Sequence, residues 1–129
     1  MGRAANQETV DIWDGAPMTT VSNALVGGRD ADGYGCKLEC PSVHPGLIAG
    51  QLPWESGEAF KAKCLTMREW AAVIVLARDK GSGSVTLDER GEPALSYPLH
   101  NADAATLTDG LGLATRILAA AGCSEVPPS

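Results

Sequence analysis

Three cysteines and a histidine are the residues of this sequence best suited to holding a metal ion. Cys36, Cys40 and His44 follow one another at intervals of four, and Cys64 supplies a distant fourth ligand. Thiolate and imidazole are groups that zinc prefers. Residues 34–40, however, alternate as in a strand, which separates Cys36 from Cys40 by roughly 13 Å, too far for one tetrahedral ion or for a disulfide. We therefore predict no metal site and interpret these cysteines as buried structural thiols.

The two histidines are the candidate general bases, because each could accept a proton if a carboxylate held its far nitrogen. His44 lies between a valine and a proline, where a turn residue bonded to the backbone is the simpler interpretation. His100 precedes a predicted helix as an exposed residue. The sequence also contains no Gly-x-Ser-x-Gly nucleophile turn. We therefore predict no catalytic residue in this chain.

The glycine-rich stretch GSGS, residues 81–84, could be a phosphate loop or a turn. A phosphate loop presents free amides at the start of a helix, whereas Val85, Thr86 and Leu87 continue this stretch as a strand. It also lacks a Gly-Lys-Ser/Thr ending and a third glycine at the dinucleotide spacing. Gly91 can adopt a positive φ in a following turn. We therefore predict a β-hairpin over 84–99 and no cofactor-binding residue.

Apolar side chains around residue 60 are the candidates for a ligand pocket, namely Trp54, Phe60 and Met67. They could line a substrate pocket, but packing in a core or an interface is the more frequent fate of such residues. Ser56 is a plausible N-cap of the helix that carries Phe60 and Met67. The apolar spacing of that helix extends to Ala71.

The remaining patterns predict strands on both sides of the candidate residues and one long helix. Residues 17–26 and 34–40 read as strands, and the aliphatic run before Asp79 as a strand buried on both faces. A helix over about 102–121 follows Asn101 as N-cap, and Gly110 and Gly112 are tolerable within it if they permit close packing. The sequence thus predicts an α+β fold with a mixed or antiparallel sheet, a β-hairpin and flanking helices.

The predicted folded region is residues 17–122, with a poorly ordered segment 1–16 and a disordered tail 123–129. Ten basic against 16 acidic residues give a net charge of −6, which argues against binding nucleic acid. The longest apolar run, residues 70–77, is far short of the ~20 residues that cross a bilayer, and the sequence shows no signal-peptide pattern. We therefore expect a soluble segment, with free thiols, whose localisation the sequence leaves open.

Several motifs resemble the glucose-methanol-choline (GMC) family of flavin-dependent oxidoreductases, and most closely its fatty alcohol oxidase-like, or long-chain alcohol oxidase, branch. They are GAPMTTVSN, GYGCKLECPSVHPG, LPWESG, RDKGSGSVTLDERGEPALSYPL and DAATLTDGLGLATRILAAAG, between residues 15 and 122. The resemblance implies part of a GMC substrate domain and the start of its C-terminal region. It also implies an enzyme that binds FAD and oxidises fatty alcohols to aldehydes by hydride transfer to the flavin.

The family's flavin fingerprint and catalytic histidine have no counterpart here, so the resemblance implies a fragment that is inactive alone and contributes walls of the substrate pocket. Its expected partners are the missing flavin domain and a fatty alcohol, and membrane association is expected only through the parent enzyme. A fragment of this kind would expose apolar faces and have marginal stability. The alternative is a small non-enzymatic α+β module that binds a partner or a lipid.

Overall fold

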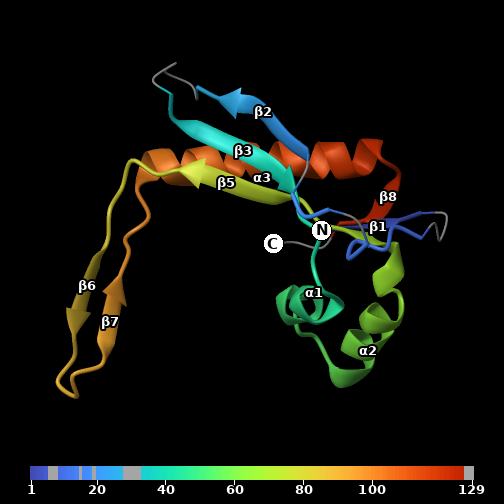
Figure 1. Cartoon of the computed structure of the whole chain (residues 1–129), viewed down its shortest axis with the longest axis horizontal. Helices are drawn as coiled ribbons and strands as arrows, with labels where there is room; N and C mark the ends of the chain where they lie inside the picture. Colours follow the sequence, from blue (N-terminus) through green and yellow to red (C-terminus); the bar gives the residue numbers. More distant parts are fainter. Residues whose placement is uncertain (6–8, 15, 19, 28–32, 127–129) are drawn as a thin grey trace.

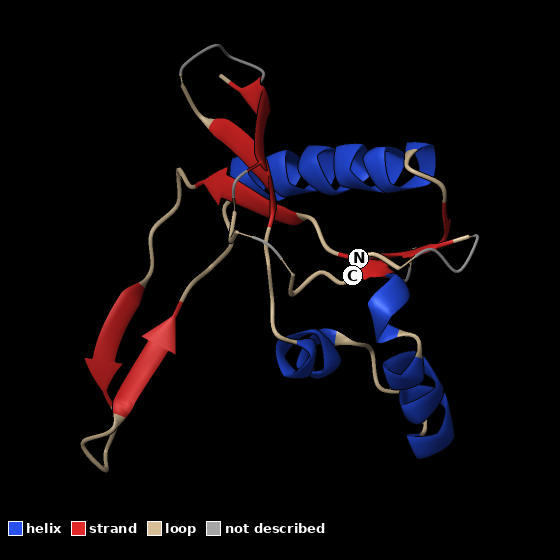
Figure 2. Ribbon diagram, turned by 45° about the vertical axis from the view of Figure 1, so that its right-hand side comes forward, coloured by secondary structure: helices blue, strands red, loops and turns tan. Residues whose placement is uncertain are grey.

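The structure is a computed structural model that describes residues 1–5, 9–14, 16–18, 20–27 and 33–126. The described part has the predicted α+β class, with short antiparallel sheets and three α-helices (Figures 1 and 2). The strands are β1 (Gly2–Ala4), β2 (Thr20–Val26), β3 (Gly35–Cys40), β4 (Trp70–Ala71), β5 (Ile74–Arg78), β6 (Ser84–Leu87), β7 (Pro93–Ser96) and β8 (Cys123–Glu125). The helices are α1 (Pro45–Gln51), α2 (Gly57–Leu65) and α3 (Asn101–Ala120), with a 3₁₀ turn η1 (Met67–Glu69).

Helix α3 joins the sheets, because it packs against β3 and β5 of one sheet and against β1 and β8 of another. The first sheet has the strand order β2-β3-β5 and the second the order β4-β1-β8. Figure 1 shows α3 running along the first sheet, with α1 and α2 on the far side of the second. The third sheet, β6-β7, extends away from both.

Gly110 lets α3 approach the β2-β3-β5 sheet closely. A Cβ atom at this position would lie 2.4 Å from Val75 Cγ1 and 2.8 Å from Cys36 Sγ. Such separations leave no room for any side chain larger than a hydrogen. Gly110 therefore meets the condition of close packing under which the sequence predicts it to be tolerable, whereas Gly112 faces open space.

Strand β5 is covered on one face only, whereas the sequence predicted a strand buried on both faces. Val75 and Ala77 share the face of β3 that carries the buried Cys36 and Leu38, and this face lies against α3. The alternate side chains of β5, Ile74 and Leu76, are exposed in the described part of the chain. An aliphatic run alone does not reveal how many layers cover a strand.

The helix that begins after Ser56 is shorter than its apolar spacing predicts. Its N-cap is confirmed, since the Ala59 amide donates to Ser56 Oγ over 3.1 Å. The helix ends at Leu65, because Thr66 turns the chain into η1 and its hydroxyl accepts the indole N–H of Trp70 at 3.1 Å. Trp70 then pairs with Arg3 as part of β4. Ala71 therefore belongs to a strand, and the predicted helical face past Leu65 is wrong.

The small core beneath α1 and α2 contains Ile48, Leu52, Met67 and Trp70. Phe60 and Cys64 of α2 pack against it, as does Ile12 from the N-terminal region. Gly2–Ala4, within the segment expected to be poorly ordered, forms the central strand of the β4-β1-β8 sheet, and Cys123–Glu125 of the expected tail forms its edge. The expectation for residues 127–129 falls outside the described residues.

The β-hairpin is confirmed, with β6 and β7 paired antiparallel from Ser84↔Ser96 to Leu87↔Pro93. Gly91 has the expected positive φ, +79°. The N-cap of α3 is His100 rather than Asn101, because His100 Nδ1 accepts the Ala102 amide at 3.2 Å. None of the described helices is long and apolar enough to span a membrane.

Candidate functional site

An apolar pocket of about 380 Å³ beside α1 is the candidate ligand site. Its walls come from α1, from the segments before α1 and before β5, and from α3. The lining residues are Met1, Pro41, Val43, Leu47, Ile48, Gln51, Pro53, Ala72, Val73, Ile74 and Leu111. Gln51 supplies the one polar side chain among them. The pocket therefore suits an uncharged apolar ligand and offers no side chain for acid–base chemistry.

Helix α1 is held in place by a cap at its start and by the core beneath it. His44 Nδ1 accepts the Gly46 amide over 3.0 Å, which confirms His44 as a turn residue bonded to the backbone. Pro45, as the first residue of the helix, needs no N–H partner there. Ile48 is buried in the core, whereas Leu47 is largely exposed at the pocket. The two histidines of the chain thus serve as helix caps.

None of the three residues predicted for a substrate pocket lines this one. Met67 is buried beside Trp70, and Phe60 packs against the same cluster. Trp54 is exposed, and its ring stands 5.5 Å from that of Phe60 at an angle of 41°. Sequence reasoning missed the residues around α1 because they are scattered among prolines and glycines, without the period of a helix or strand.

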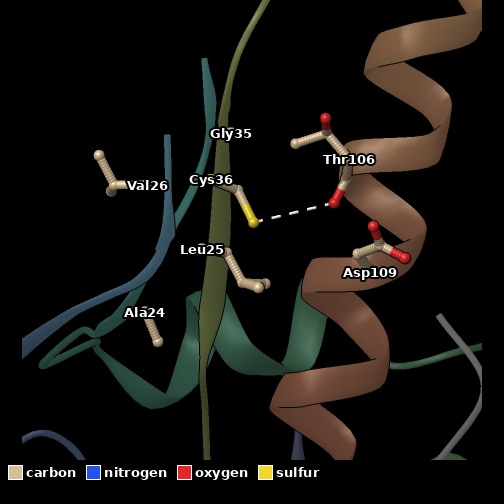
Figure 3. A pocket seen from close by; sticks show the side chains of 7 residues that line it. All are labelled: Ala24, Leu25, Val26, Gly35, Cys36, Thr106 and Asp109. Atoms are coloured by element: carbon tan, nitrogen blue, oxygen red, sulfur yellow. Dashed lines mark hydrogen bonds between the residues drawn. The ribbon is translucent and has the colours of Figure 1, made fainter. Parts of the chain in front are cut away.

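A smaller pocket of about 150 Å³ lies between β2, β3 and α3 (Figure 3). Cys36 points into it from β3, and its thiol donates to the Thr106 carbonyl over 3.8 Å. Burial raises the pKa of the Cys36 thiol, and the negative charge of Asp109 raises it further. A thiol that stays protonated is a poor nucleophile, so Cys36 is a structural residue.

The other cysteines do not share the environment of Cys36. Cys40, expected to be buried, is exposed because it ends β3, and Cys64 is partly buried beside the α1–α2 core. All four cysteines are free thiols. Among the described residues there is no group of three or more histidine, cysteine, aspartate or glutamate side chains placed to hold a metal ion.

Two backbone amides at the start of the glycine-rich stretch are bound by a carboxylate of the chain itself. The backbone N–H groups of Lys80 and Gly81 donate to Asp103 Oδ1 and Oδ2, each over 2.8 Å. The bond from Lys80 is the main reason that the pKa of Asp103 is lowered, and the bond from Gly81 adds to it, although desolvation opposes both. Asp103 is 2% exposed. Residues 81–83 form no turn of their own but lead directly into β6, so the predicted hairpin is confirmed, whereas its turn lies at residues 88–91.

Comparison with known proteins shows similarity to long-chain-alcohol oxidases of Arabidopsis thaliana. The chain is 32% identical to long-chain-alcohol oxidase FAO4A over 114 residues, which are 88% of this chain and 15% of that protein. It is 39% identical to FAO1 over 89 residues, or 69% of this chain and 11% of that one. The chain is 32% identical to FAO3 over 114 residues, which are 88% of this chain and 14% of that protein.

The aligned part of the chain thus spans only about 11–15% of the length of these curated relatives. No family model matches the chain. A search of the solved structures also found no match. The homologues of this chain are therefore long-chain-alcohol oxidases, and the similarity covers most of the chain and a short stretch of each relative.

Proposed function

We propose that this chain is a segment of an FAD-dependent long-chain alcohol oxidoreductase of the GMC family, which converts fatty alcohols to aldehydes. The similarity to long-chain-alcohol oxidases over 88% of the chain is the observation that carries the proposal. The sequence carries no flavin fingerprint, and the Lys80 and Gly81 amides at the start of the glycine-rich stretch are bound by Asp103. In this proposal FAD and the catalytic histidine therefore belong to other parts of the enzyme.

The role proposed for this segment is to supply part of the wall that contacts the alkyl chain. The pocket beside α1 supports this role, because ten of its eleven lining side chains are apolar. Each methylene group moved from water into such a pocket contributes about 0.8 kcal/mol. Phe60 and Met67 would support the wall from within the core, since Ile48 belongs both to that core and to the pocket. Trp54 would extend the apolar surface at the exposed side.

The experiment is a chimera in which this chain replaces the aligned stretch of FAO4A, with aldehyde formation from a long-chain alcohol as the readout. Leu47→Lys places a charge in the pocket wall, where we expect a raised KM for long-chain alcohols and little change for short ones. Leu65→Lys is the matched control, because Leu65 is also an exposed leucine on a helix, at 86% against 62% for Leu47, but does not line the pocket.

The isolated chain is expected to form no aldehyde from the same alcohol. Turnover by the isolated chain would contradict the proposed role as a segment, and a folded chimera without turnover would contradict the proposed function. If the isolated chain bound the alcohol through Leu47 while the folded chimera stayed inactive, the result would favour the alternative of a non-enzymatic lipid-binding module. Equal effects of Leu47→Lys and Leu65→Lys would remove the pocket from the proposal.

A further inference from the structure

The hairpin arm, residues 79–99, presents one apolar face that nothing in the described part of the chain covers. Side chains two apart in a strand share a face, and so do residues directly opposite in the ladder. The pairs Val85↔Leu95 and Leu87↔Pro93 therefore form one face, which we call the apolar arm face. Val85, Leu87 and Leu95 are 71%, 72% and 80% exposed. The opposite face carries Ser84, Thr86, Ala94 and Ser96.

Hydrogen bonds hold the base of the arm in place. The Tyr97 hydroxyl donates to Asp79 Oδ2 over 2.5 Å. This bond joins the two legs of the arm, which are the segment before β6 and the segment after β7. The legs also touch at Gly83, where a Cβ would lie 2.5 Å from the Ser96 carbonyl oxygen. Asp103 of α3 binds the first leg through its two amide contacts. The arm therefore leaves the rest of the protein in a defined direction (Figure 2).

The tip of the arm is also an ordered turn. Asp88 Oδ1 accepts the amides of Arg90 and Glu92 over 2.8 and 2.9 Å, and the Asp88 amide donates to the Glu92 carbonyl over 2.9 Å. Each part of the hairpin thus has local support, yet a two-stranded hairpin is marginally stable in water unless its apolar face packs against something. A contiguous exposed apolar face of this kind is typical of an interaction site.

The size of the face indicates which occupant fits. The face consists of four side chains, whereas a stable interface between separate proteins takes about 20–30 residues from each side. A stable complex of separate proteins buries about 800 Å² on each partner. A second copy held through this face alone would therefore bind weakly. A surface in the same polypeptide needs far less area, because the tether raises its effective concentration.

Charge and chain length point to the same occupant. The arm carries Asp79, Asp88, Glu89 and Glu92 against Lys80 and Arg90, a net charge of −2, in a chain of net charge −6. Repulsion therefore disfavours both a second copy and an anionic membrane. In FAO4A, by contrast, the 85% of the protein outside the aligned stretch provides ample surface within one polypeptide.

We propose that the apolar arm face docks onto an apolar protein surface in the remainder of an alcohol-oxidase polypeptide, an inference that rests on the proposed function. The arm is then a preformed hairpin. Its apolar face is buried against that surface, and the opposite face with its serine and threonine side chains stays in water. This assigns the exposed leucines and valine of β6 and β7 to an interface within one enzyme rather than to a contact between enzymes.

The test compares the accessibility of the two arm faces in the isolated chain and in the FAO4A chimera. Leu95→Cys reports on the apolar arm face, and Thr86→Cys is the matched control on the opposite face. Each variant is labelled with a maleimide, and peptide mass spectrometry follows the rate at that position separately from the native cysteines. We expect Leu95→Cys to react at least about tenfold more slowly in the chimera than in the isolated chain, and Thr86→Cys to react equally in both.

Equal labelling of Leu95→Cys in the two contexts would overturn the proposal. If the chimera does not accumulate, the same pair of substitutions is made at the aligned positions of FAO4A, where protection of only the position aligned with Leu95 supports docking and equal labelling overturns it. Protection of Leu95→Cys in the isolated chain, by dimerisation or by neutral phosphatidylcholine vesicles, would also overturn it. A chimera that protects Leu95→Cys but forms no aldehyde would refute the proposed function and leave the docking intact.

Discussion

Replacing Gly110 by alanine tests how closely α3 approaches the sheet. An alanine in a helix gains about 1 kcal/mol over glycine in intrinsic propensity. Its Cβ, however, would lie 2.4 Å from Val75 Cγ1 and 2.8 Å from Cys36 Sγ. Overpacking of this kind costs about 1–3 kcal/mol, and we expect the upper part of that range because β-branched Val75 cannot turn away easily. The net result is a loss of about 1–2 kcal/mol in the free energy of unfolding.

Gly112→Ala is the control in the same helix, because nothing lies within 4 Å of the added Cβ. It should stabilise the chain by about 1 kcal/mol, so the two variants should differ by about 2–3 kcal/mol. Urea unfolding of the wild type and both variants, followed by circular dichroism of the helix signal, measures the difference. Equal shifts in the same direction for the two variants would refute the close contact between α3 and β5.

Three further perturbations address the caps and the base of the arm. Asp103→Asn should lower the free energy of unfolding. In the wild type the stabilisation by Asp103 should be fully present above its ordinary pKa of 3.8 and should be lost as the pH falls through its lower folded pKa. Urea unfolding at a series of pH values measures this dependence. The hydrogen bond to Asp79 raises the pKa of Tyr97 to about 12, so this contact should persist above pH 10 and be lost near pH 12. Asp79→Asn should lower the pKa of Tyr97, which an ultraviolet absorbance titration of the phenol measures. Ser56→Ala should lower the free energy of unfolding by about 1 kcal/mol through loss of the α2 cap, whereas an unchanged urea midpoint would contradict that role.

Features with a local chemical cause could be predicted from the sequence. The hairpin, its Gly91 turn and the Ser56 cap each depend on a few neighbouring residues, and the structure has all three. The long helix was predicted to within a residue at each end, but its cap was assigned to Asn101, although His100 can accept an amide through Nδ1 just as well.

Features that depend on distant partners could not be predicted in the same way. The end of α2 is set by Trp70, which is drawn into a strand with Arg3, a residue far away in the sequence. The exposed face of β5 depends on how many layers cover it, which its composition does not encode. The pocket beside α1 needs the fold to assemble residues from four separate segments, and its scattered apolar residues had no period to reveal them.

The central position of β1 has a consequence for the order in which the chain folds. β1 pairs with β4 and also with β8, where Ala4 stands opposite Cys123. Closing that loop of roughly 120 residues costs about 3 kcal/mol more in chain entropy than closing the short turn between β6 and β7. We therefore expect the hairpin and the helices to form early and the β4-β1-β8 sheet to close late, as the step that limits the folding rate.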